Sequence, residues 1–142
     1  MPTPESLLTS FPLLASPVAG GRQHWQTGNA SVREVMLNIL LTRPGERLMR
    51  PEFGAGIRSF IHHPNNETTR ALIADAALRA LRRWEPRVSI EAVRAVADPE
   101  RLSQVNLEVR YRLLADERRE TLQLAAVVGR RFDFALISST MV

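Results

Sequence analysis

The stretch RALRRWEPRVSI, residues 79–90, holds the transition from helix to strand around which this chain is organised. Apolar residues recur at helical spacing as far as Trp84, and a run typical of a strand follows Arg87. Pro86 lacks a backbone N–H and disfavours helical geometry at the residue before it, so the helix is expected to end there. The corner therefore carries an acid, Glu85, and a base, Arg87, on either side of a proline.

The two charges of this corner allow two interpretations. In an extended chain Glu85 and Arg87 are two residues apart and project to the same side. Glu85 is then either held within the chain, by Arg87, Arg83 or Arg47, or at least one charge is left for a partner protein. On the second interpretation, alanine at either position leaves the isolated domain folded but blocks assembly.

Upstream of the corner, residues 67–84 show the pattern of an amphipathic helix, and Asn65 or Asn66 is expected to cap its start. Its apolar face is rich in alanine, which indicates close packing against a sheet. That face is formed by Ile73, Ala74, Ala77, Leu78, Ala80, Leu81 and Trp84.

An earlier helix is predicted from Ser31, because Ser31 and Glu34 have the spacing of a capping box. One apolar face is formed by Val32, Val35, Met36, Ile39 and Leu40. Leu37 and Leu41 form a second apolar stripe. Either this helix is buried on most sides, or the second stripe meets another subunit.

Between the helices, residues 43–57 read RPGERLMRPEFGAGI. Pro44 and Gly45 predict a turn, and residues 46–50 predict a short extended piece. Gly54 and Gly56 indicate places where the backbone is tight.

Downstream of the corner the pattern is that of strands. Residues 88–96 are apolar but irregular, which indicates a bulge, and residues 121–128 predict a third strand. In between, alternate residues are expected to face inward: Val105, Leu107, Val109, Tyr111 and Leu113. The predicted fold is α+β, a small antiparallel β-meander of three or more strands packed against two main helices. Such a meander exposes an edge that a partner strand can extend.

The domain is expected to span residues 31–129. Residues 1–30 hold four of the nine prolines and predict an irregular N-terminal segment. Residues 130–142 predict a C-terminal tail, either an appended strand or an arm that reaches a neighbour.

The composition narrows the class of protein. The 142 residues suit one domain, and 44% hydrophobic residues can form a core. The N-terminal residues lack a convincing secretory signal and no apolar run could span a bilayer, so a soluble intracellular protein without membrane insertion is expected. The net charge is +4, and all 19 basic residues are arginines interleaved with acids. This pattern is typical of a protein-contacting surface rather than a nucleic-acid stripe.

The sequence offers no credible catalytic site. There is no cysteine, and the three histidines, His24, His62 and His63, have no metal-binding spacing. Glu46, Glu52 and Glu85 lie beside arginines, which suits ion pairing better than acid catalysis. We therefore expect no enzyme activity, no metal and no cofactor.

Two motifs in this chain, ILLTRPGERLMRPEFGAGI (residues 39–57) and RRWEPRV (residues 82–88), together resemble one family. It is the small baseplate wedge family of contractile injection machines, which includes the GPW-like proteins of phage tails and the type VI secretion subunit TssE. The resemblance extends over residues 31–128.

The resemblance implies a structural protein that binds the larger wedge subunits and presents a surface on which the first ring of sheath protein assembles. It implies several copies in a ring-shaped baseplate, in a phage tail-like particle in the cytoplasm, with a spike or hub adaptor as a further candidate partner. It also implies a set of partner-binding residues: Gly45, Glu46, Arg47, Pro51, Phe53, Gly54, Glu85, Pro86 and Arg87. A nucleic-acid-binding module and a regulatory adaptor protein are the alternatives.

Overall fold

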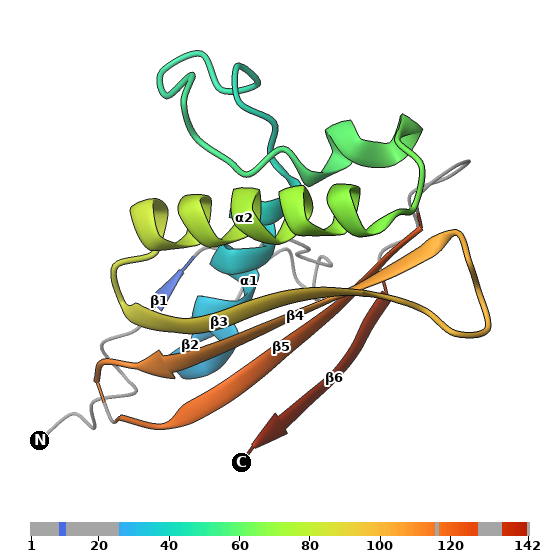
Figure 1. The fold of residues 1–142 in the computed structure, drawn as a ribbon. Coiled ribbons are helices and arrows are strands. Elements are labelled where there is room, and N and C mark those ends of the chain that lie inside the picture. Colours follow the sequence, from blue (N-terminus) through green and yellow to red (C-terminus); the bar gives the residue numbers. More distant parts are fainter. Residues whose placement is uncertain (1–8, 11–25, 116, 128–134, 142) are drawn as a thin grey trace, which may run out of the picture.

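A four-stranded antiparallel sheet and two helices form the body of the molecule (Figure 1). The computed structural model describes residues 9–10, 26–115, 117–127 and 135–141. The elements are β1 (Thr9–Ser10), β2 (Gln26–Thr27), α1 (Gly28–Leu41), the 3-10 helix η2 (Ile57–His62), α2 (Glu67–Trp84), β3 (Val88–Ala97), β4 (Gln104–Leu113), β5 (Arg119–Val127) and β6 (Ala135–Met141). The predicted α+β fold, a meander packed against two helices, is confirmed.

The strands of the sheet follow one another in sequence order, β3-β4-β5-β6, and each pairs antiparallel with the next. The predicted bulge lies between Ile90 and Ala92 of β3. All five β4 residues expected to face inward are buried. The period-two pattern therefore placed the central strand and its core face correctly.

Helix α2 has the bounds that its sequence predicts. Asn66 caps it, and the Asn66 side chain accepts a hydrogen bond of 2.7 Å from the backbone N–H of Thr69. Ile73, Ala77 and Leu81 are buried against the sheet. Their spacing of four residues keeps one stripe of the helix on the core.

Helix α1 differs from its prediction. It begins at Gly28, three residues before Ser31, so Ser31 lies within the helix and is fully buried. Leu37 is also buried and belongs to the core. Of the two interpretations of the second apolar stripe, the structure therefore supports a helix buried on most sides.

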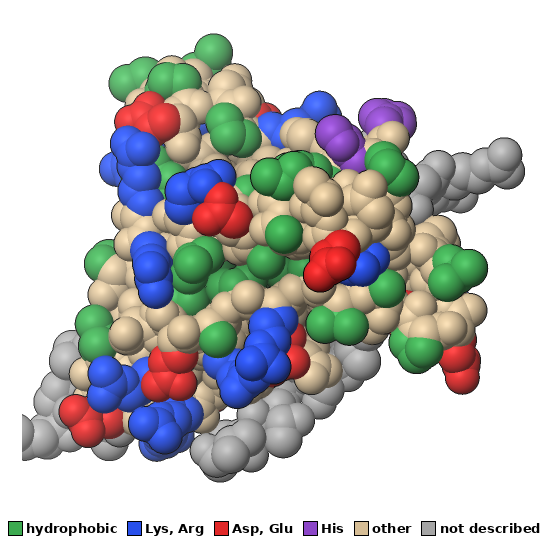
Figure 2. Space-filling model, in the orientation of Figure 1, with side chains coloured by type: hydrophobic (Ala, Val, Ile, Leu, Met, Phe, Trp, Pro, Cys, Tyr) green, Lys and Arg blue, Asp and Glu red, His purple; other side chains and the backbone are tan. Residues whose placement is uncertain are grey.

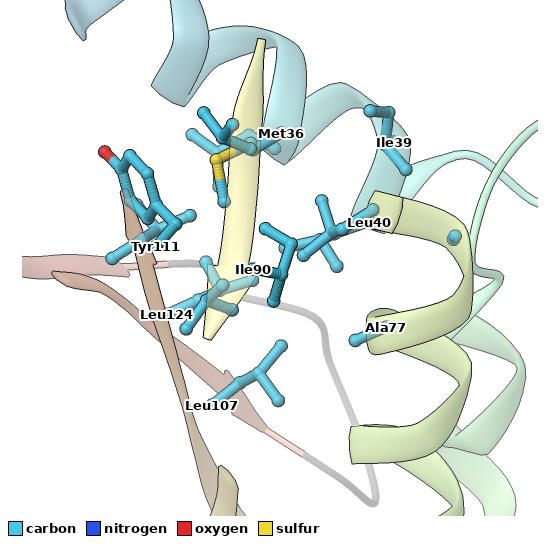
Figure 3. Packing of buried hydrophobic residues seen from close by; sticks show 14 of the residues in the cluster. Met36, Ile39, Leu40, Ala77, Ile90, Leu107, Tyr111 and Leu124 are labelled. Carbon is cyan, nitrogen blue, oxygen red and sulfur yellow. The ribbon is translucent and has the colours of Figure 1, made fainter. Parts of the chain in front are cut away.

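Residues of α1, α2 and the inward face of β3, β4 and β5 form one hydrophobic core. Figure 3 shows Met36 and Leu40 of α1 and Ala77 of α2 directed toward the sheet. The sheet contributes Ile90, Leu107, Tyr111 and Leu124 to the same core. This core holds the end of α2, and with it the corner at Glu85, against α1.

The segment between α1 and η2 is a series of turns rather than the extended piece expected at residues 46–50. The predicted turn at Pro44 and Gly45 is present. In Figure 1 the loop stands out on the side of α2 that faces away from the sheet. Local turn hydrogen bonds hold this segment, and none of the described strands pairs with it.

The tail forms β6, which pairs with β5. It is thus an appended strand, and within the described part of the chain β3 and β6 are the two edge strands of the sheet. Most of the expected irregular segment 1–30 lies outside the described residues, which there include only the short β1–β2 pair and the start of α1. None of the described helices is both long and apolar enough to cross a membrane.

Candidate functional site

The corner between α2 and β3 is built by the end of the helix and the start of the sheet. The Glu85 N–H makes the last helical hydrogen bond, 2.9 Å to the Leu81 carbonyl, and its φ of −120° and ψ of 82° are already outside helical geometry. One residue beyond Pro86, the carbonyl of Arg87 accepts 3.0 Å from the N–H of Leu114. The last helical hydrogen bond is therefore made at the residue before Pro86, as the proline predicts, and β3 begins at Val88.

At this corner Glu85 and Arg87 form a bidentate ion pair. Arg87 Nε donates to Glu85 Oε1 at 2.7 Å, and Arg87 Nη2 donates to Oε2 at 2.6 Å. The Glu85 side chain is 1% exposed and that of Arg87 is 26% exposed. The hydrogen bond with Glu85 raises the pKa of Arg87 above its usual range. Parallel hydrogen bonds in this geometry fix the orientation of both groups.

A third partner ties the corner to α1. Arg87 Nη1 donates to the hydroxyl oxygen of Ser31 at 3.1 Å. The sequence pattern assigned Ser31 to a helix cap, so this role was missed. A buried serine inside an otherwise apolar helix stripe is the signal that could have indicated a polar partner.

Of the three arginines considered for Glu85, Arg87 is the one that holds it. Arg83 lies 3.6 Å from Glu52 instead, and Arg47 donates to Asn38 Oδ1 at 3.0 Å. The carboxylate of Glu85 faces the interior, which supports the internal interpretation for this residue. Arg87 keeps about a quarter of its side chain at the surface, and a contact of that part with a partner stays a prediction.

The other motif, residues 39–57, forms a closed loop above α2. Gly45 N–H donates to the Pro51 carbonyl across the base of the loop. The Glu46 carboxylate accepts 2.9 Å from the N–H of Arg43. The guanidinium of Arg47 lies 4.0 Å from the centre of the Phe53 ring. Glu46 and Arg47, expected to meet partners, thus also have structural contacts within the loop.

The two motifs meet through their aromatic residues. The rings of Phe53 and Trp84 lie 5.2 Å apart, and Trp84 directly precedes Glu85 in the chain. Arg83 lies 4.9 Å from the Trp84 ring. The structure therefore brings residues 45–54 and 85–87 to one end of α2. Gly45, Glu46, Arg47, Pro51 and Pro86 are exposed there, whereas Phe53, Gly54 and Glu85 are buried.

Gly54 is the point at which the loop contacts the end of α1. Its φ is +108°, and a Cβ at this position would lie 2.2 Å from the backbone oxygen of Thr42. The same oxygen accepts the N–H of Gly56 at 3.0 Å. A residue with a side chain would therefore meet a fixed carbonyl, which explains why glycine occupies the position.

A separate polar network joins the first turn of α1 to the sheet. Tyr111 OH donates to Asn29 Oδ1 at 2.8 Å, and Asn29 Nδ2 donates to the carboxylate of Glu120. Burial raises the pKa of Tyr111 above its usual range. These side chains satisfy one another inside the molecule, which is typical of a structural network.

The described residues contain no group of three or more histidine, aspartate or glutamate side chains that could hold a metal ion. The two buried glutamates, Glu85 and Glu120, are both occupied by hydrogen bonds from neighbouring side chains. The site is therefore a junction tied by internal hydrogen bonds, with an exposed loop beside it.

One known protein family matches the part of the chain that contains this corner and loop. A family model described as "Baseplate wedge protein gp25" matches residues 26–118, which include both motifs, the two helices and β3 and β4. The chain belongs to this baseplate wedge family. It is therefore a component of a baseplate of the phage tail-like kind.

Two solved structures resemble this baseplate wedge protein. A Geobacter sulfurreducens protein named as a tail lysozyme is 31% identical, with a TM-score of 0.62, over 70% of this chain and 89% of that one. A chain of the anti-feeding prophage baseplate is 22% identical, with a TM-score of 0.69, over 80% of this chain and 90% of that one, and shows the fold alone. A search of curated proteins finds no match to this chain.

Proposed function

We propose that this baseplate component joins the larger wedge subunits to the first ring of sheath protein. The corner and the loop above α2 contact the wedge subunits, and the open edge of β3 takes up a strand from the sheath. The observation that carries the proposal is the edge of β3 together with the groove beside it. Exposed edges present unpaired N–H and C=O groups that a partner strand can use.

The groove runs between α2 and β3 and has a volume of about 490 Å³. Its walls are largely small residues, Ala71 and Ala74 of α2 and Ala95 and Ala97 of β3. Small side chains leave room for those of an added strand. Arg70, Arg94 and Glu67 also line the groove. The two arginines outnumber the single glutamate, which favours a strand that carries acidic residues.

The surface that we propose to contact the wedge subunits is the end of α2 where the two motifs meet. Pro86 and the loop residues Glu46 and Arg47 are exposed, and Arg87 is partly so. Because the sheet edge and this loop lie on opposite sides of α2 (Figure 1), one molecule can contact a wedge subunit and a sheath subunit at the same time.

Filling the groove tests the sheath contact. We expect Ala71→Glu to leave baseplates intact but to prevent sheath from polymerising on them, because a long charged side chain occupies the space beside β3. Leu72→Glu is the matched control, since the neighbouring residue is exposed and does not line the groove. Electron microscopy of particles from cells that produce each variant gives the readout. Normal sheaths on Ala71→Glu baseplates would exclude strand addition at this edge.

The lysozyme name of one similar structure raises the question of glycoside hydrolysis. Such hydrolysis needs two carboxyl groups that flank a substrate, one of them protonated to act as an acid. In the part of the chain that the structure describes, Glu85 is bound by a guanidinium and Glu120 by an amide, both away from solvent. This supports a structural role for this chain.

We therefore expect the purified chain to release no soluble sugar from peptidoglycan. The assay follows the turbidity of a cell-wall suspension at several protein concentrations, with an active muramidase as the positive control. Clearance in proportion to the amount of chain would overturn the structural assignment.

Nucleic-acid binding has less support. Several exposed arginines of the described surface lie beside acids, as in the pairs Arg79–Asp75 and Arg110–Glu108. Acidic groups placed among the cations weaken the attraction for phosphate. The arrangement favours a surface that contacts other proteins.

A further inference from the structure

The outer end of the loop between α1 and η2 presents two large apolar side chains to solvent. Leu48 is 97% exposed and Met49 is 93% exposed. Figure 2 shows hydrophobic side chains at the far end of this loop, beyond a belt of charged ones. Single exposed apolar residues are ordinary, but two neighbouring ones at the end of a projecting loop mark a contact site.

This apolar tip, Leu48 and Met49, is carried by a loop with a defined shape. The Arg50 N–H donates to the Arg47 carbonyl at 3.2 Å, which closes a turn around the tip, and the Phe53 N–H donates to the Arg50 carbonyl at 3.0 Å. At the base, Gly45 bonds to Pro51. The tip is therefore held in place before any partner binds, and a preformed loop loses less conformational entropy on binding.

Two arginines of the loop that carries the tip, Arg43 and Arg50, form no ion pair among the described residues. The guanidinium of Arg50 lies 6.0 Å from the centre of the Trp84 ring. Of the two carboxylates in the same loop, Glu52 pairs with Arg83 and Glu46 accepts a hydrogen bond from the backbone N–H of Arg43. Residues 43–52 carry three arginines against these two glutamates, an excess of positive charge that a partner with carboxylates complements.

We propose that the apolar tip is a plug that enters an apolar pocket of a neighbouring baseplate protein, with aspartate or glutamate side chains on the rim of that pocket. The proposal rests on the chain being a baseplate component, and it adds a contact of its own to the sheath-joining function. A membrane is the less favoured occupant, because two apolar side chains and two arginines give too little buried surface and charge for stable attachment to lipid.

Removal of the plug tests the proposal. We expect Leu48→Ser/Met49→Ser to melt at the temperature of the unmodified chain, since both side chains are exposed, but to enter assembled baseplates on the order of tenfold less. Leu102→Ser/Leu114→Ser is the matched control, because these two leucines are also exposed, at 82% and 57%, and lie elsewhere on the surface. Incorporation is measured by quantitative mass spectrometry of purified particles. Equal incorporation of both double variants would overturn the proposal.

The chemistry of the pocket is tested by a photoreactive residue at position 49 of the full chain in assembled particles. A cross-link to a protein segment that holds apolar residues and at least one carboxylate supports the proposal. Cross-linking to lipid, or to no protein, would exclude it. The separate variant Arg43→Glu/Arg50→Glu should also be incorporated into baseplates less than the unmodified chain. An increase in its incorporation would contradict an acidic rim on the pocket.

The outcomes also separate this proposal from the sheath contact. If Ala71→Glu particles carry normal sheaths while the tip variant stays out of baseplates, the proposed strand addition fails and the plug stands. If the tip variant is incorporated normally while Ala71→Glu particles lack sheath, the plug fails alone.

Discussion

Replacing Arg87 with alanine is expected to lower the free energy of unfolding by about 3 kcal/mol, near the lower end of the range for breaking a buried ion pair. Glu85 is 1% exposed, so the variant leaves a carboxylate inside the molecule without the guanidinium that neutralises it. The hydroxyl of Ser31 in α1 loses its hydrogen bond from Arg87 at the same time. The loss should be visible as a lower midpoint in equilibrium urea unfolding.

Two controls separate burial from charge. Arg119→Ala removes an exposed cation that lies 3.3 Å from Glu91, and it should change stability by less than about 1 kcal/mol. Glu85→Leu/Arg87→Leu removes both charges and should recover much of the stability that Arg87→Ala loses. If Arg87→Ala unfolds at the same urea concentration as Arg119→Ala, the pair does not stabilise the corner. A role for Arg87 in partner binding alone would then be favoured.

Gly54→Ala is expected to destabilise the protein by about 2–5 kcal/mol, as the sum of backbone strain and overpacking. The φ of +108° is one that residues with a Cβ rarely adopt, and the added methyl group would lie 2.2 Å from the backbone oxygen of Thr42. That oxygen cannot move freely, because it also accepts the N–H of Gly56. The end of α1 or the base of the loop must therefore shift.

Gly45→Ala is the matched control for this effect. Gly45 has a φ of +88°, but a Cβ there would meet no atom within 4 Å. It should cost only the backbone strain, about 1–2 kcal/mol. Urea unfolding of the two variants side by side gives the difference, which measures the clash with Thr42. If both variants lose the same free energy of unfolding, the close approach to Thr42 does not destabilise Gly54→Ala.

Elements with a strong local pattern were predicted from the sequence with nearly correct bounds. Helix α2 has a cap at Asn66 and a proline after Glu85, so both of its ends are determined by residues next to them. Strand β4 alternates without interruption, and its inward face is the one that the alternation indicates. These features depend on neighbours along the chain, which is why the sequence alone reveals them.

The errors lie where a distant contact decides the structure. Ser31 has the spacing of a cap, yet its hydroxyl bonds to Arg87, which is 56 positions away. Residues 46–50 have an extended pattern, but they form turns in which Arg47 packs on Phe53, and none of the described strands pairs with them. In both places a tertiary contact is stronger than the local preference.

What the sequence determined by itself is the position of the corner, because Pro86 ends a helix whatever surrounds it. The motifs around that corner also indicated the baseplate wedge family. Only the tertiary structure decided whether the charged side chains of the corner face the interior or the solvent. Glu85 and Arg87 lie on the same side of any extended chain, but only in the folded protein is the Glu85 side chain removed from water, at 1% exposure. A carboxylate without solvent needs a cation beside it, and Arg87 is therefore held as its internal partner.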